Sequence, residues 1–283
     1  MTTLDDYIGQ TPTWCTGCGN FSILNTLKKA LVELEIKPHL ITIVSGIGQG
    51  AKLPHYTKCN TFNGLHGRAI PAATGIRLAN NKMPVIVISG DGDCYGEGGN
   101  HLIHSIRRNI NIKVFVHDNQ IYGLTKGQAS PTTLQGTVTK TQPFGANAAS
   151  LNPIALAIAL DCGFVARGYA ADIDFLKILM MKAINHNGFA LLDILQPCVT
   201  FNNVNTYNWY KERVYRLNDN YNPHDRVEAF KLAIEQNDKI PTGIIYLKEK
   251  PTFEERIPII KETPLVRQAF SIEPMIKELD KFY

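Results

Sequence analysis

Apolar residues recur along the first part of the chain with the spacing of helices and of buried strands in turn. Between Ile23 and Leu34 they lie three and four positions apart behind a cap at Asn20, and residues 39–45 then form an apolar run typical of a buried strand. This alternation predicts an α/β fold with a mostly parallel sheet and helices on both faces. Four further pairs of a helix and a strand are predicted over residues 69–78 and 84–88, 98–108 and 112–117, 153–162 and 164–166, and 173–185 and 189–195.

The pattern breaks down after Cys198. Residues 199–224 are rich in Asn and Tyr, a helix begins near Asp225, and the remainder mixes short strands with turns that contain Pro. We therefore predict an α/β domain over residues 1–198 and a C-terminal extension over residues 199–283, packed on that domain or on a partner subunit.

The composition excludes the extreme classes of protein. With 44% hydrophobic and 19% charged residues, the chain is expected to be an ordinary soluble globule. No apolar stretch approaches the roughly 20 residues that cross a bilayer, and residues 1–10 lack the apolar core of a secretory signal. The net charge of +4 comes from scattered basic residues, which argues against nucleic acid as a partner. A cytoplasmic protein that binds neither membrane nor nucleic acid is expected.

Three of the predicted strands end in residues suited to a phosphorylated ligand. In a parallel sheet, ligands bind beyond the carboxyl ends of the strands. Glycines there let backbone amides approach a diphosphate, and the helix that begins near Gly98 points its positive end at the same place. The three strand ends read Gly46-Ile47-Gly48, Gly90-Asp91-Gly92-Asp93, and Asp118-Asn119 followed by Tyr122-Gly123.

Two of these residues are suited to bind Mg²⁺. The ion prefers carboxylates and other oxygen ligands, and Asp91 offers a carboxylate while Asn119 offers an amide oxygen. One helix and one strand separate them, so both side chains are expected at neighbouring strand ends. Acidic turns after strands are common, and Asp91 alone would be weak evidence, whereas the pair indicates a metal-bound diphosphate.

Several motifs resemble one enzyme family. The stretch from Gly90 to Asn119 resembles the thiamin diphosphate signature, with Asp118-Asn119 where the signature usually has two Asn. The other motifs look like the beta subunit of the 2-oxoacid:ferredoxin oxidoreductases, in the order found in that family and across most of the chain. They are Trp14-Cys15-Thr16-Gly17-Cys18-Gly19, Ser45-Gly46-Ile47-Gly48, Gly64-Leu65-His66-Gly67-Arg68-Ala69, Tyr122-Gly123-Leu124-Thr125-Lys126-Gly127-Gln128, and Pro197-Cys198.

The resemblance implies a site for thiamin diphosphate and Mg²⁺. Asp91, Asn119 and the backbone carbonyl of Ile121 are expected to bind the ion. His66 is expected near the thiazolium ring as a hydrogen-bond donor or proton relay. Lys126 either pairs with the substrate carboxylate or a phosphate of coenzyme A, or is an exposed loop lysine. The residues expected to contact the cofactor are Gly46, Ile47, Gly48, His66, Gly90, Gly92, Asp93, Asn119, Ile121, Gly123, Leu124 and Thr125.

The cysteines indicate a second centre. A Cys-x-x-Cys pair alone fits a redox motif, half of a zinc site or half of an iron-sulfur site. The resemblance implies that Cys15, Cys18 and Cys198 bind a 4Fe-4S cluster together with a cysteine in the Gly-Ile-Gly loop, where this chain has Gln49. An amide is a poor ligand for iron. We expect Cys59 to supply the fourth thiolate, and the alternatives are a cluster with three thiolates or no cluster.

The function that the resemblance implies is oxidative decarboxylation of a 2-oxoacid to an acyl-CoA and CO₂, with electrons passed through the cluster to ferredoxin. The chain holds one half of the cofactor site, so an alpha subunit with the pyrimidine-binding domain is expected as its partner in a heterodimer. The loop over residues 125–133 resembles the members of the family that use 2-oxoglutarate more than those that use pyruvate, and both remain candidate substrates. Two alternatives remain: a non-redox thiamin diphosphate decarboxylase or carboligase subunit, and a non-catalytic iron-sulfur or zinc-binding module.

Overall fold

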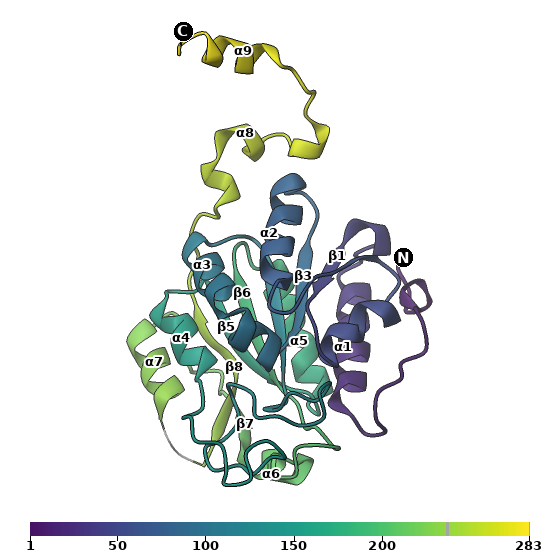
Figure 1. The fold of residues 1–283 in the computed structure, drawn as a ribbon, viewed down its shortest axis with the longest axis vertical. Coiled ribbons are helices and arrows are strands. Elements are labelled where there is room, and N and C mark those ends of the chain that lie inside the picture. Colours follow the sequence, from purple (N-terminus) through teal and green to yellow (C-terminus); the bar gives the residue numbers. More distant parts are fainter. Residues whose placement is uncertain (236–237, 283) are drawn as a thin grey trace.

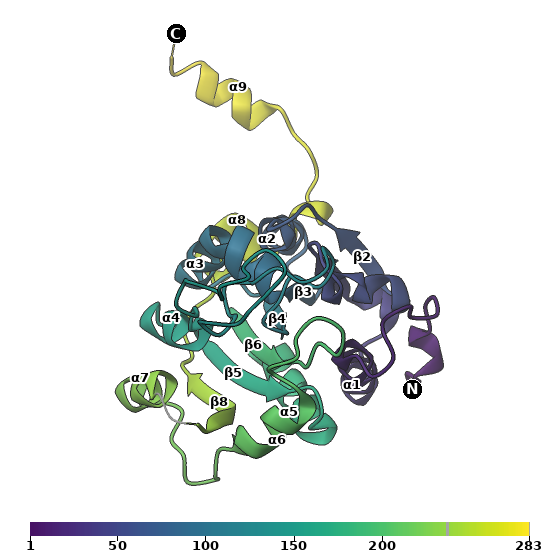
Figure 2. The same cartoon turned by 60° about the horizontal axis from the view of Figure 1, so that its bottom comes forward.

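Eight strands in the described part of the chain form one sheet, in the spatial order β2-β1-β3-β4-β6-β5-β8-β7 (Figures 1 and 2). The computed structural model describes residues 1–235 and 238–282. From β2 to β5 all neighbouring strands run parallel, and β8 runs antiparallel to β5. The strands are β1 (Thr42–Ser45), β2 (Asn60–Asn63), β3 (Val85–Gly90), β4 (Lys113–Asp118), β5 (Phe164–Tyr169), β6 (Ala190–Leu195), β7 (Val214–Arg216) and β8 (Ile240–Leu247).

Helices cover both faces of the sheet, and each face has its own hydrophobic core. Successive side chains of a strand point to opposite faces, so Ile86 and Ile88 of β3 join one core while Val85 and Val87 join the other. The first core includes side chains from α1 (Gly19–Glu33) and α5 (Ile173–Asn185). The helices that contribute to the second core are α2 (Ala69–Ala79), α3 (Gly99–Arg108), α4 (Pro153–Ala159) and α7 (Arg226–Ile234).

The α/β class predicted from periodicity is confirmed, and most predicted elements lie close to their expected bounds. The predicted helices over residues 69–78 and 98–108 correspond to α2 and α3. The edge strand β2 was not predicted, because its residues are exposed and form no apolar run. None of the helices within the described residues has both the length and the apolar character needed to cross a bilayer.

Part of the predicted C-terminal extension belongs to the sheet. After α6 (Tyr207–Arg213), β7 pairs with β8, and β8 pairs with β5 of the central sheet. Farther along, α8 (Pro258–Lys261) lies against the domain, whereas α9 (Glu273–Leu279) stands away from it in both views (Figures 1 and 2). The extension is therefore an added edge of the sheet followed by a projecting arm.

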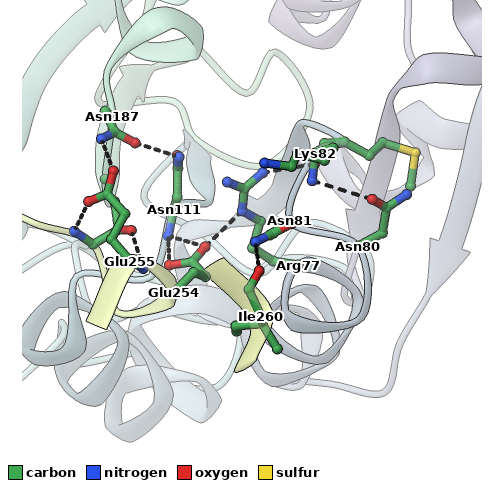
Figure 3. Close-up of polar contacts among 12 residues, drawn as sticks. Arg77, Asn80, Asn81, Lys82, Asn111, Asn187, Glu254, Glu255 and Ile260 are labelled. Carbon is green, nitrogen blue, oxygen red and sulfur yellow. Dashed lines mark hydrogen bonds and ion pairs between the residues drawn. The ribbon is translucent and has the colours of Figure 1, made fainter. Parts of the chain in front are cut away.

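A polar network fastens residues 251–261 to the amino ends of the central strands (Figure 3). The carboxylate of Glu254, which is 2% exposed, accepts hydrogen bonds from Arg77 Nε at 2.7 Å and from the backbone nitrogen of Asn111 at 3.2 Å. Asn81 Nδ2 donates to the carbonyl of Ile260 at 2.6 Å. We call this group, Arg77, Asn81, Asn111, Glu254 and Ile260, the C-terminal clasp.

Breaking the clasp is expected to destabilise the fold. Glu254→Ala leaves the Arg77 guanidinium, which is 12% exposed, without its carboxylate partner. A broken buried ion pair costs about 3 kcal/mol, so the free energy of unfolding in urea should fall by roughly that amount. The neighbouring Glu255 is exposed, and Glu255→Ala should cost less than about 1 kcal/mol. Equal losses in the two variants would contradict a special role for the buried pair.

Candidate active site

The carboxyl ends of the neighbouring strands β1, β3 and β4 lie side by side at one end of the sheet. The motif residues come directly after these strand ends in the chain. Gly90 of β3 pairs with His117 of β4, so Asp91 and Asp118 stand side by side at the two strand ends. The structure thus confirms that these strand ends are neighbours. A π-helical turn over Gly92–Glu97 then leads from β3 into α3, and such turns are frequent at functional sites.

Asp91 is a buried carboxylate held only by neutral donors. Its Oδ2 accepts hydrogen bonds from the hydroxyls of Ser130 at 2.5 Å and Thr132 at 2.7 Å. Burial raises the pKa of Asp91 to about 6, against the lowering effect of these two hydrogen bonds. The negative charge is therefore costly here without a cation.

Two further buried carboxylates lie close to Asp91. Thr132 Oγ1 is 2.8 Å from Asp118 Oδ1 as well as hydrogen-bonded to Asp91. Burial, and then the charges of Asp193 and Asp91, raise the pKa of Asp118 well above its usual range. Asp193 accepts from the Tyr95 hydroxyl at 2.7 Å and pairs with Arg167 at 3.4 Å. Thr132 has a single hydroxyl hydrogen, so Asp91 and Asp118 compete for it.

Asn119 and Ile121 form the turn after β4. Asn119 Oδ1 accepts a hydrogen bond from the backbone nitrogen of Ile121 at 3.0 Å. The loop then closes where the backbone nitrogen of Tyr122 donates to the carbonyl of Gln128 at 2.9 Å, and its tip is exposed at Leu124, Thr125 and Lys126. Lys126 lies in the left-handed region with φ of 75°, which is uncommon for a residue other than glycine.

Asp93 holds the loops around the site together. Its Oδ1 lies 2.7 Å from His66 Nδ1 and accepts from the backbone nitrogens of Gly67 at 2.8 Å and Ile47 at 3.1 Å, while Oδ2 accepts from Ser89 at 2.5 Å. The sequence suggested contact with a diphosphate, whereas the structure shows this carboxylate already engaged by protein donors. Its carboxylate therefore joins the loops that follow β1, β2 and β3.

This arrangement depends on a glycine beside Asp93. A Cβ on Gly46 would lie 1.9 Å from Asp93 Oδ2, so no larger residue fits at position 46 without moving the carboxylate. Gly46 thus serves the packing of the loops. Gly48, at φ of 123°, has open space around its missing side chain, which leaves its backbone accessible to a ligand.

Three of the predicted cluster ligands line one small pocket beside this loop. Cys15, Cys18 and Cys198 share its wall with Gln49 and with Asn119 of the β4 turn. Burial raises the pKa of the Cys18 thiol to about 11, with smaller contributions from Cys198 and Cys15. Among the described residues, no three His, Cys, Asp or Glu side chains are placed to bind one metal ion. Cysteines on a cluster bind different irons and therefore stand farther apart than ligands of a single ion.

The structure does not bring Cys59 to this pocket, and we correct that expectation. Cys59 directly precedes β2, whose first residue Asn60 pairs with Thr42 at the start of β1. It packs against the first hydrophobic core, and burial raises the pKa of its thiol to about 12. The reason is a 3-10 turn over Gly50–Tyr56, which carries the chain back along the sheet before β2 begins.

Sequence reasoning missed the polar residues that surround the predicted ones. Ser130 and Thr132 come from the long loop after β4, where periodicity says nothing about the path of the chain. Lys52 lines the cysteine pocket, and Glu97 ends the π-helical turn. The run Ser130-Pro131-Thr132-Thr133 is the signal that could have pointed to hydroxyl donors, because such a polar run lies just beyond the thiamin motif.

Two family models match adjoining parts of the chain. Residues 46–194 match the model for the thiamine pyrophosphate enzyme, C-terminal TPP binding domain. Residues 198–262 match the model for the C-terminal part of the pyruvate ferredoxin oxidoreductase beta subunit. The first match begins directly after β1 and runs through β2 to β6, and it includes β3 and β4, which carry the Asp91 and Asn119 motifs.

Curated relatives and a solved structure agree with these models. The chain is 47% identical over 258 residues to the 2-oxoacid:ferredoxin oxidoreductase subunit beta of a Sulfolobus species, covering 86% of this chain and 85% of the relative. It is 36% identical over 256 residues to the 2-oxoglutarate synthase subunit KorB of Methanocaldococcus jannaschii, covering 86% and 90%.

The solved structure is the 2-oxoglutarate:ferredoxin oxidoreductase from Magnetococcus marinus with 2-oxoglutarate, coenzyme A and succinyl-CoA bound. It matches with a TM-score of 0.92 at 33% identity, covering 98% of this chain and 96% of that chain. The resemblance found in the motifs is thereby confirmed, as is the fold class. The chain belongs to the beta-subunit family of the 2-oxoacid:ferredoxin oxidoreductases, and its sheet forms the thiamin-diphosphate-binding domain of that family.

Proposed function

We propose that this chain, paired with an alpha subunit, converts a 2-oxoacid and coenzyme A to an acyl-CoA and CO₂ and delivers the electrons to ferredoxin. One observation carries the proposal. The pocket lined by Cys15, Cys18 and Cys198 is also lined by Asn119 and Gly123 of the loop expected to hold thiamin diphosphate. A cofactor in that loop and a redox centre in the pocket would be immediate neighbours, as electron transfer between them requires.

The residues at the strand ends fit Mg²⁺ and a diphosphate. Asp91 is a buried carboxylate with neutral donors and a raised pKa, a setting in which a bound cation offsets the cost of the charge. Asp91, the Asn119 amide and the Ile121 carbonyl would hold the ion, and the open backbone at Gly48 would admit a phosphate. Bound thiamin diphosphate supplies a carbon nucleophile for the 2-oxo group and an electron sink.

The three grouped thiols fit an iron-sulfur cluster with three protein thiolates. Gln49 lines the same pocket where the family has a cysteine, and Cys59 lies elsewhere. Thiolates are the protein ligands that such clusters prefer. We therefore retain Cys15, Cys18 and Cys198 as the proposed ligands and leave one iron without a protein thiolate.

The substrate proposed is 2-oxoglutarate. Two of the relatives described above carry this substrate in their names, and the cysteine pocket has a lysine, Lys52, in its wall. An ammonium group is suited to a substrate carboxylate. Lys126, exposed at the tip of the loop, is the second proposed contact for a carboxylate or for a phosphate of coenzyme A, and His66 is proposed to face the reacting carbonyl.

An alpha subunit is proposed to complete the site. The matched family model is one thiamin-binding domain, and the relative from Sulfolobus is named as a beta subunit. Several apolar side chains around the carboxyl ends of the strands are exposed, namely Ile47, Phe62, Leu65 and Leu124. Such a group of exposed apolar residues is typical of a protein interface. We also propose a cytoplasmic location, since all six cysteines are free, as in a reducing compartment.

The test is an anaerobic assay of the chain with and without its alpha partner. The complex should reduce a viologen dye in a reaction that requires coenzyme A and 2-oxoglutarate, with pyruvate as the comparison substrate, and the beta chain alone should not. Turnover by the beta chain alone would contradict the proposed division of labour. Decarboxylation without dye reduction would instead favour the non-redox thiamin enzyme.

A further inference from the structure

Glu97 connects the loop that follows β2 to the loop that follows β4. It ends the π-helical turn Gly92–Glu97, and its side chain is 43% exposed. Both of its carboxylate oxygens lie 3.2 Å from the hydroxyl of Tyr122, which donates to them, and Oε2 lies 3.5 Å from His66 Nε2. His66 belongs to the loop after β2 and Tyr122 to the loop after β4, so this one carboxylate links loops from two sides of the strand ends.

The backbone is shaped for this contact. Gly67, next to His66, has φ of 70°, and a Cβ there would lie 2.5 Å from the carbonyl carbon of Glu97. Only glycine lets the His66 loop approach the π-helical turn so closely. The rings of His66 and Tyr122 also meet edge to face, with centroids 6.3 Å apart. The three side chains therefore form one packed group, which we call the Glu97 bridge.

The two nitrogens of His66 differ in their surroundings. Nδ1 is 2.7 Å from the Asp93 carboxylate, which is buried and also bound by three other donors. Nε2 has only the longer, partly exposed contact to Glu97. Nδ1 is thus committed to Asp93, and Nε2 is the nitrogen on which Glu97 can act.

We propose that Glu97 is a positioning residue, which braces the Nε2 edge of the His66 ring and joins the Tyr122 loop to it, so that the imidazole keeps its place beside the loop expected to hold the cofactor. This proposal rests on the proposed function and adds a residue to it. Glu97 does not touch the reacting atoms and acts through His66. A carboxylate offers two acceptor oxygens to the tyrosine hydroxyl and keeps one of them beside the imidazole, whereas a glutamine amide replaces one of these acceptors with a donor.

A double-mutant cycle in the alpha-beta complex tests the proposal. Glu97→Gln should lower kcat about fivefold, the value of about one net hydrogen bond, with KM for the 2-oxoacid and the affinity for thiamin diphosphate changed less than about twofold. In a His66→Asn background, Glu97→Gln should have almost no further effect, because the group through which it acts is gone. Glu97→Asp should recover part of the lost rate. Glu255→Gln, at the opposite edge of the sheet, is the control and should leave kcat unchanged.

The outcomes separate this proposal from the proposed function. If Glu97→Gln lowers kcat by the same factor in the presence and in the absence of His66, the carboxylate does not act through the imidazole and the proposal is wrong. A loss confined to thermal stability or to cofactor affinity overturns it as well. If the unmodified complex shows no 2-oxoacid turnover, both fail together, whereas normal turnover with additive losses removes only the role of Glu97.

Discussion

Asp91→Asn is expected to reduce turnover of the alpha-beta complex, and its affinity for thiamin diphosphate in the presence of Mg²⁺, by more than about a hundredfold. Mg²⁺ depends on carboxylate oxygens, and loss of a ligand costs at least as much as the ten- to hundredfold typical of residues behind the ligands. The amide fits the same space and keeps oxygen and nitrogen atoms within reach of Ser130 and Thr132, so the fold should survive.

Thermal unfolding distinguishes loss of the site from loss of the fold. Thiamin diphosphate with Mg²⁺ should raise the unfolding temperature of the unmodified chain but not that of Asp91→Asn. Without cofactor the variant should unfold no earlier than the unmodified chain, because it removes a buried charge whose pKa is raised by desolvation. Asp174→Asn, on the exposed side of α5, serves as control. Equal protection of Asp91→Asn and the control by cofactor would contradict the metal site.

Cys18→Ser is expected to abolish dye reduction while leaving thiamin diphosphate binding intact. Serine keeps the size of cysteine but is a poor ligand for iron in a cluster. The anaerobically purified complex should lose the iron and sulfide that belong to the beta chain. Viologen reduction should then fall by more than about a hundredfold, which corresponds to an activation barrier raised by about 2.8 kcal/mol or more. Protection by thiamin diphosphate against heating should remain.

Cys59→Ser is the matched control for Cys18→Ser. Both thiols are partly buried, with pKa values raised to about 11 and about 12, but only Cys18 lines the shared pocket. Iron content and dye reduction should therefore stay within about twofold of the unmodified complex when Cys59 is replaced. A loss of iron in Cys59→Ser, or retention of iron in Cys18→Ser, would show that the assignment of thiols is wrong.

The central fold could be predicted because its strands are covered on both faces. Strand β3 begins with an apolar run and β4 has an apolar centre, and the parallel arrangement places their carboxyl ends together. The neighbourhood of Asp91 and Asp118 follows from that rule alone. The family motifs then point to the correct enzyme class, which the comparisons confirm.

The features that the sequence did not predict lie in segments without a repeating pattern of apolar residues. The position of Cys59 is set by the 3-10 turn that returns the chain to the amino ends of the strands, and this turn has no periodic signal. Ser130 and Thr132 reach Asp91 from a long loop whose path depends on tertiary contacts. The edge strand β2 is exposed and lacks an apolar run, and the antiparallel strand β8 lies beyond the region of regular helix-strand alternation, so the side-chain pattern indicates both only weakly.

The C-terminal clasp lies at the amino ends of the strands, opposite to the loops of the candidate active site and about 20 Å away at roughly 3.3 Å per strand residue. Substitutions separated by such a distance usually have additive effects on stability. The clasp is therefore a place to add thermal robustness without altering chemistry, and a reinforced Arg77–Glu254 region would compensate for active-site variants that weaken the fold. The clasp is at the amino ends of the central strands and the candidate active site is at their carboxyl ends. Substitutions can therefore accumulate at one end during evolution while the other end is preserved.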